Sequence, residues 1–156
     1  MTTENYQDPT DFNPADYADE DMGYTFLDID TSGAIEPTVA DEGEHLIRIT
    51  GFKKDKESGK VVRTSDSGMR YFLVTFDLPN DLAAKSFTQI YSLPTDSMEP
   101  KRKNSCLWEL DCFKRCFALT ELNFSTMVGA EGYAILGIKE DSYGRQNYIK
   151  KLVTPA

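Results

Sequence analysis

The segment 131–153, EGYAILGIKEDSYGRQNYIKKLV, constrains the fold more than any other part of the chain. Side chains alternate along a β-strand, so Ala134, Leu136 and Ile138 share one face, opposite Tyr133, Ile135 and Lys139. The residues EDSYG then separate this run from a second one that carries both cations and an aromatic ring. The pattern predicts a β-hairpin in which one arm helps to close a core and the other is offered to a partner.

Three earlier runs also have the composition of strands. They are HLIRITGFKK (45–54), MRYFLVTFDL (69–78) and KSFTQIYSL (85–93). Each is rich in β-branched or aromatic residues, and the first two alternate clearly. In the second run we expect Phe72, Val74 and Phe76 to face the interior. A long polar connection rich in turn residues separates the first two runs.

One run has helical periodicity instead, NSCLWELDCFKRCFALT (104–120). Its apolar residues at helical spacing are Cys106, Leu110, Phe113 and Phe117. Asn104 or Ser105 can cap the first turn, and the preceding PTDSMEPKRK reads as a loop. The element order β-β-β-α-β-β predicts a mainly β protein, a five-stranded antiparallel OB-fold barrel with one helix between strands three and four. Other five-stranded barrels and sandwiches fit the same order.

Charge is distributed unevenly along the chain. Residues 1–43 contain 12 acidic residues and no Lys or Arg, so residues 44–156 hold the other 14 acidic and all 17 basic residues, a net charge of +3. Residues 1–23 have too little apolar surface to offset the entropy of ordering, which predicts a disordered acidic arm. Residues 24–43 are expected to be a lead-in segment that packs across the domain, and 44–156 to be the folded domain.

Several functional classes find no support in the sequence. Cys106, Cys112 and Cys116 lack the paired spacing of a zinc site, and His45 is remote from them, so we expect free thiols. The chain has no evident nucleophile–base pair and no phosphate-binding glycine-rich motif. We therefore expect no enzymatic activity, metal or cofactor. The chain also lacks the long apolar run of a membrane span and begins with a polar, acidic stretch, so we expect an intracellular protein.

In an OB-fold, the ligand lies across strands two and three and between two flanking connections. Single-stranded nucleic acid needs cations that follow its backbone and rings on which bases stack. The predicted phosphate contacts are Lys53, Lys54, Lys56, Lys60, Arg63, Arg70, Lys139, Arg145, Lys150 and Lys151. The predicted stacking rings are Tyr71, Phe87, Tyr91, Tyr143 and Tyr148. Taken singly, a lysine-rich connection is typical of a solvated loop, and Phe87 also fits a core. Trp108 lies off the apolar stripe of the helix, where an indole more often covers the end of a barrel than contacts a ligand.

The segments DEGEHLIRITGFKKDK, YFLVTFDLP and EGYAILGIKEDSYGRQNYIKKLV, in this order, resemble bacteriophage OB-fold single-stranded-DNA-binding proteins. The resemblance spans roughly residues 26–153. It implies a protein that coats single strands during phage DNA replication or recombination in the cytoplasm of a bacterial host.

Composition, element order and resemblance together predict a non-catalytic, sequence-tolerant binder of single-stranded DNA. The alternative is a protein-interaction module whose acidic arm mimics nucleic acid or recruits replication or recombination proteins. An enzyme subunit ranks third, because no catalytic constellation supports it. We also predict that the arm competes with DNA for the groove.

Overall fold

The structure is a computed structural model that describes residues 28–155. The chain divides into two units, Met1–Ile35 and Glu36–Ala156, and all the helices and strands discussed below belong to the second. The predicted acidic arm, residues 1–23, lies outside the described residues, as does its predicted competition with DNA.

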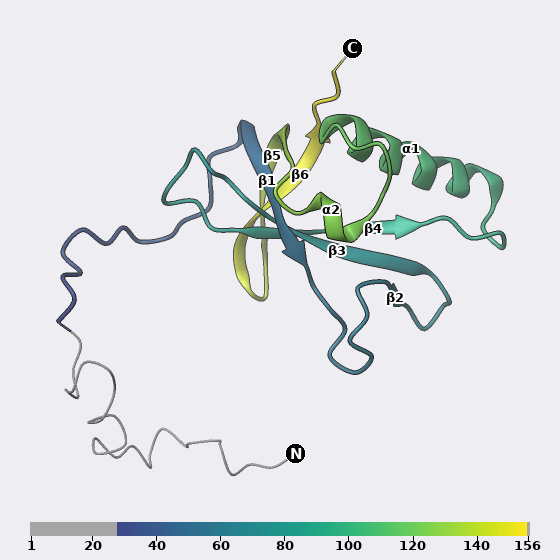
Figure 1. Ribbon diagram of the computed structural model, residues 1–156, viewed down its shortest axis with the longest axis horizontal. Coiled ribbons are helices and arrows are strands. Elements are labelled where there is room, and N and C mark those ends of the chain that lie inside the picture. Colours follow the sequence, from purple (N-terminus) through teal and green to yellow (C-terminus); the bar gives the residue numbers. More distant parts are fainter. Residues whose placement is uncertain (1–27, 156) are drawn as a thin grey trace, which may run out of the picture. The chain divides into compact units, whose positions relative to one another are not determined.

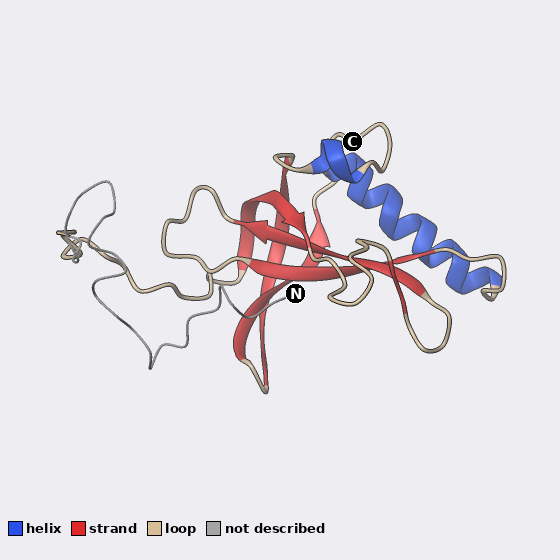
Figure 2. Cartoon of the chain, turned by 60° about the horizontal axis from the view of Figure 1, so that its bottom comes forward, coloured by secondary structure: helices blue, strands red, loops and turns tan. Residues whose placement is uncertain are grey.

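The second unit is mainly β, with an open antiparallel sheet of six strands and two helices (Figures 1 and 2). Its elements are β1 (Gly43–Phe52), β2 (Arg63–Thr64), β3 (Arg70–Asp77), β4 (Phe87–Leu93), α1 (Pro100–Cys116), α2 (Phe124–Met127), β5 (Glu131–Asp141) and β6 (Gly144–Leu152). The strand order is β2-β3-β1-β5-β6, and β4 pairs with the other side of β3. The five predicted strands and the helix after the third are present. The two-residue β2 and the single-turn α2 are additions that are too short to produce a periodic signal.

The helix α1 begins at Pro100, so the predicted start at Asn104 or Ser105 is wrong. Glu99 is the N-cap residue and makes no side-chain capping bond. Proline is favoured in the first turn because its fixed φ is already helical. It also lacks the backbone N–H, which has no acceptor within the helix at that position, so no hydrogen bond is lost. The residues that follow Pro100 therefore form the first turn of the helix and not a loop. Lys114 and Arg115 stand in the last turn, where cations complement the helix dipole.

The core lies between the inner face of the sheet and α1. The predicted inner residues Phe72, Val74 and Phe76 of β3 are buried, and so are Ala134 and Leu136 of β5. All four residues of the predicted helical stripe are buried as well: Cys106, Leu110, Phe113 and Phe117. Each aromatic pair in such a core stabilises the fold by about 0.5–1.5 kcal/mol in addition to the effect of the apolar area that it buries. The alternation of the strands and the helical periodicity thus predicted the faces of these elements correctly.

The residues just before β1 are held to the rest of the folded unit by hydrogen bonds. The Thr38 amide donates to the Ala83 carbonyl (2.8 Å), and the Lys85 amide donates to the Thr38 carbonyl (2.8 Å). Ala40 is buried, and both its amide and its carbonyl bond to the side chain of Asn147. The folded unit therefore includes residues ahead of the predicted domain start at residue 44.

The two outer strands β4 and β6 lie next to each other without forming a ladder. One side-chain bond crosses this seam, from the Ile149 amide to Gln89 Oε1 (3.3 Å). In both overall views α1 lies on the side of the sheet away from the tip of the β5–β6 hairpin. The unit therefore presents two separate regions, one around the hairpin tip and one around the seam below α1.

Candidate nucleic-acid interface

The connection between β1 and β3 carries the first group of predicted phosphate contacts. Its lysines are all exposed: Lys53, Lys54, Lys56 and Lys60. Asp55 lies among them, but its carboxylate accepts from the Glu57 amide (3.1 Å) and the Ser58 hydroxyl (3.2 Å). Its backbone also bonds to Lys60 and Gly59 across the turn. Asp55 thus shapes the loop that displays the lysines.

Arg63 differs from these lysines because it is half-buried on β2. Its Nη2 donates to the Lys54 carbonyl at 3.0 Å, while its Nε is buried and has no partner. This guanidinium ties β2 to the lysine-bearing turn, so it supports the shape of the loop. Arg70, at the start of β3, is exposed.

The tip of the β5–β6 hairpin carries the second group. Asp141 Oδ1 accepts from the Tyr143 amide (2.8 Å). Gly144 has φ 103°, which glycine adopts without the strain that a Cβ brings. The strands extend to Asp141 and resume at Gly144, so the turn is shorter than the predicted EDSYG. Tyr143 is 90% exposed, and Lys139 and Arg145 are exposed on either side of it. The tip therefore presents one ring and two cations to solvent, together with the exposed carboxylates of Glu140 and Asp141.

Figure 1 shows the hairpin tip and the β1–β3 connection extending toward the same side of the sheet, below β3 in that view. On the outer face of β3, Tyr71 is half-buried and lies beside Arg63 and Ser92 in the register. The fold thus brings the two basic segments to one side, with the outer face of β3 available beside them.

The structure contradicts the prediction that Phe87 and Tyr91 are stacking rings. Phe87 and Tyr91 are only 5% and 6% exposed, and they pack on Phe76 (ring centroids 5.4 Å apart) and Phe72 (5.8 Å). Their register partners on β3 are these same two inner residues, so both rings point into the core. Burial raises the pKa of the Tyr91 hydroxyl, which stays protonated. Neither ring can stack on a base.

Tyr148 lies on the outer side of the hairpin, packed against a glycine. A Cβ on Gly137 would lie 2.7 Å from the Tyr148 ring and 2.8 Å from Lys150 Cε. The ring and the lysine stem therefore lie side by side across the bare backbone of β5. Lys150 Nζ is 3.2 Å from Glu42 Oε2, and within the described residues it is the one predicted phosphate contact in an ion pair. Lys151, its neighbour, is exposed.

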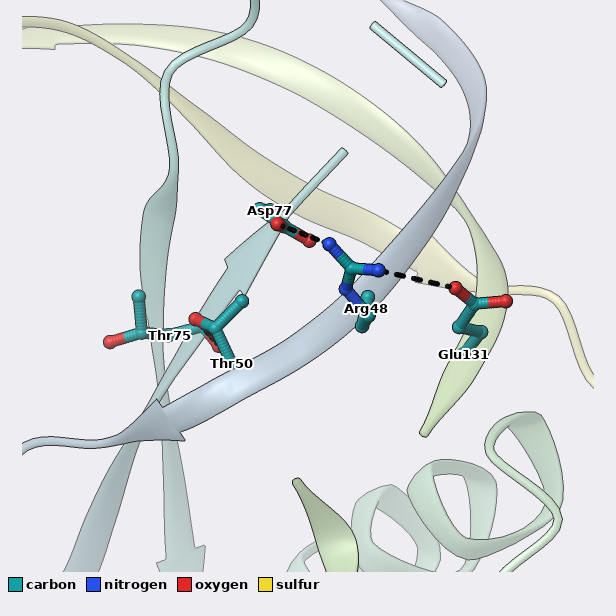
Figure 3. Close-up of polar contacts among 5 residues, drawn as sticks. All are labelled: Arg48, Thr50, Thr75, Asp77 and Glu131. Carbon is teal, nitrogen blue, oxygen red and sulfur yellow. Dashed lines mark hydrogen bonds and ion pairs between the residues drawn. The ribbon is translucent and has the colours of Figure 1, made fainter. Parts of the chain in front are cut away.

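On the outer face of β1, the charge of Arg48 is neutralised by two carboxylates (Figure 3). Arg48 Nη2 lies 2.9 Å from Asp77 Oδ2, and its Nη1 lies 3.9 Å from Glu131 Oε2. The hydrogen bond from Arg48 to Asp77 raises the pKa of this guanidinium. Next to the cluster, the Thr50 hydroxyl donates to the Thr75 carbonyl (3.1 Å). Arg48 is neutralised by strands on both sides, so this part of the sheet does not offer a phosphate site.

Sequence reasoning missed a groove of about 420 Å³ at the seam between β4 and β6. Its walls come from β4, α1, β6 and the residues after β6, and they include Ile90, Trp108, Lys150 and Lys151. Trp108 and Ile90 are 60% and 52% exposed. The sequence signal was an indole off the apolar stripe of its helix, which we assigned to covering a barrel end.

The structure defines the surroundings of the Cys116 thiol and the arrangement of the metal-binding side chain types within the described residues. Burial raises the pKa of the Cys116 thiol to about 11, so it is neutral at physiological pH. No group of three or more His, Cys, Asp or Glu side chains in residues 28–155 is arranged to hold a metal ion. None of the described helices is long and apolar enough to cross a membrane.

Comparison with known proteins gives no further guidance. No protein-family model matches the chain, and no curated protein matches it.

Proposed function

We propose that the chain is a non-catalytic, sequence-tolerant single-stranded-DNA-binding protein and that its sheet is an OB-fold. The connectivity supports the fold: β1, β3 and β4 form a meander, α1 follows, β5 returns to pair with β1, and β6 ends next to β4. This order fits a five-stranded, partly open Greek-key barrel to which β2 and α2 have been added. The resemblance to phage proteins suggests DNA replication or recombination in a bacterial cytoplasm as the setting.

The observation that carries the function is the common direction of the two basic segments. The lysine-bearing β1–β3 connection and the tip of the β5–β6 hairpin extend to the same side of the sheet. Tyr71, Tyr143 and Tyr148 remain accessible rings, and binding of single strands combines such cations with such rings. Exposed cations without acidic partners can exchange their counterions for DNA phosphates, whereas the paired Arg48 cannot do so freely.

Binding is expected to depend strongly on salt, because each phosphate contact releases condensed counterions. For about four contacts on a single strand, the slope of log affinity against log salt is about −3, so a rise from 50 to 200 mM salt should weaken binding about fiftyfold. The measurement is the anisotropy of fluorescein-labelled oligo(dT) titrated with the full-length protein. A flat salt dependence would falsify electrostatic binding.

Matched lysine variants locate the contacts. Lys54→Gln, in the β1–β3 connection, should reduce the salt slope by about 0.7, the contribution of one phosphate on a single strand. Lys85→Gln, an exposed lysine outside both basic segments, should leave the slope unchanged. Equal slopes for both variants would place the DNA elsewhere. A matched duplex, whose bases are not free to stack, should bind more weakly than oligo(dT) at the same salt.

Gly137→Ala should weaken DNA binding while leaving the fold intact. The new methyl group would meet only the far ends of Tyr148 and Lys150, which can swing away from β5. Loss of a base stacked on Tyr148 would weaken oligo(dT) binding by about five- to 150-fold, and Tyr148→Ala should have a similar effect. Because both changes act on one ring, the double variant should be scarcely weaker than either single variant. Thermal melts verify folding, and wild-type affinity in the folded Tyr148→Ala protein would put the stacking site elsewhere.

A further inference from the structure

We propose that bound single-stranded DNA continues from the hairpin into the seam between β4 and β6, and that one of its bases stacks on Trp108. This inference rests on the proposed function and assigns a DNA contact to a residue outside both basic segments. It combines three observations: an open apolar groove, an indole held by a neighbouring cation, and a continuous row of side chains from Tyr148 to the groove.

The groove has the size and lining for a flat apolar group. Its cavity of about 420 Å³ is walled by the apolar parts of Ile90, Trp108, Ile149 and Leu152. Ile90 and Trp108 are large apolar side chains that remain more than half exposed. Burying such apolar area is favourable by about 25 cal/mol per Å². A nucleobase inserted against the indole would cover this surface.

Arg115 holds the indole in place from one side. Its guanidinium carbon lies 5.2 Å from the centre of the Trp108 ring, a cation–π geometry. Asp111 in turn fixes Arg115, with Arg115 Nε 3.0 Å from Asp111 Oδ2. One face of the indole therefore carries a positioned cation, and the indole also lines the groove that we assign to a base.

A row of side chains links this groove to the hairpin. Tyr148 and Lys150 lie side by side over Gly137, and Lys150 also lines the groove together with Lys151. Tyr148 and Lys150 are two residues apart on β6, a distance of about 7 Å. A strand stacked on Tyr148 would thus reach Lys150 and Lys151 with its phosphates and the Trp108 ring with its next bases.

Acidic residues near the groove oppose this path only weakly. Glu109 lines the groove, and Glu42 pairs with Lys150. Both side chains of the Glu42–Lys150 pair are about half exposed, and such surface pairs contribute about 0–1 kcal/mol, so a phosphate can replace the carboxylate. Lys151, which is exposed and in no ion pair within the described residues, and Lys150 both line the groove, and two adjacent lysines suit the phosphates of single-stranded DNA.

The chain provides its own reporter, because Trp108 is its one tryptophan. Titration of the full-length protein with unlabelled oligo(dT) should quench and shift the tryptophan emission. The midpoint should match that obtained from the anisotropy of labelled oligo(dT), which does not depend on the indole. If anisotropy shows saturation while the tryptophan emission is unchanged, the Trp108 contact is wrong and the proposed function stands. If anisotropy shows no binding, the proposed function fails as well.

Two substitutions separate stacking from packing. Trp108→Ala should weaken oligo(dT) binding by about five- to 150-fold, and Trp108→Phe should retain part of the lost affinity because a smaller ring still stacks. Leu107→Ala is the matched control, since Leu107 is a neighbouring exposed apolar residue of α1 that does not line the groove. Sedimentation velocity measures the oligomeric state of each variant. Unchanged DNA affinity of Trp108→Ala, with or without dissociation of an oligomer, would overturn the proposal; dissociation would assign the groove to contact between copies of the chain.

Discussion

Replacing Asn147 with alanine is expected to lower the free energy of unfolding by about 3 kcal/mol. The Asn147 side chain is 2% exposed and holds the chain ahead of β1 against the hairpin. Its Oδ1 accepts from the Ala40 amide (2.8 Å), and its Nδ2 donates to the carbonyls of Ala40 (3.0 Å) and Gly137 (3.2 Å). Truncation leaves buried backbone groups without partners, at about 1–3 kcal/mol for each group. Urea unfolding of wild type and variant measures the difference.

Two further variants test whether this bonding is the cause. Gln146→Ala removes a neighbouring amide that donates to the Asp141 carboxylate near the surface. It should lower the free energy of unfolding by less than about 1 kcal/mol, the contribution of a single exposed hydrogen bond. Asn147→Asp keeps the acceptor, but its burial would raise the folded-state pKa of the new carboxyl above its unfolded value of about 3.9. Stability of this variant relative to wild type should therefore be greatest below about pH 4 and should fall as pH rises through the folded-state pKa. A pH-independent difference would contradict this account.

Gly132→Ala should destabilise the protein by about 3 kcal/mol, at the upper end of the usual cost of overpacking. A Cβ on Gly132 would lie 2.6 Å from the Cys116 carbonyl oxygen and 2.7 Å from its Sγ. The obstacle is the backbone at the end of α1, which cannot move without shifting the helix from the sheet. Chemical unfolding provides the measurement.

Gly137→Ala is the matched control for this prediction, because it makes the same change in the same strand. At Gly137 the new methyl group meets only movable side-chain ends, so we expect little loss of stability and a clear loss of DNA binding. Gly132→Ala should show the reverse order of effects, with DNA affinity retained by the fraction that remains folded. Equal stabilities of the two variants would show that α1 can adjust its position on β5.

Asn147 shows how an element can be predicted while the role of a residue in it is not. The run after Arg145 predicted a strand whose polar residues face a partner, and that strand is present as β6. Asn147 nevertheless points inward, paired in the register with Ile138. Its partner Ala40 is 107 residues away in sequence, so no local pattern could have indicated a buried amide at this position.

The third strand shows a similar limit. In KSFTQIYSL both faces carry apolar residues, with Phe87 and Tyr91 on one and Ile90 on the other, so alternation alone did not decide which face is inside. Pairing with β3 decided it, because Phe87 and Tyr91 lie opposite the inner residues Phe76 and Phe72. The rings that we expected on the DNA-binding face therefore became core, and Ile90 became part of the seam.

The sequence by itself determined the five longer strands of the sheet, the presence of the one long helix, and the inner faces of β3 and α1, because each of these depends on a repeat within a single segment. It also located the two basic connections. Only the tertiary structure decided that these connections extend to the same side and that Phe87 and Tyr91 are buried. It alone placed Trp108 and Lys150 in the lining of one groove at the seam. Those features depend on the register between strands and on the position of α1 on the sheet. Both are set by packing between residues far apart in sequence, which periodicity within a segment cannot report.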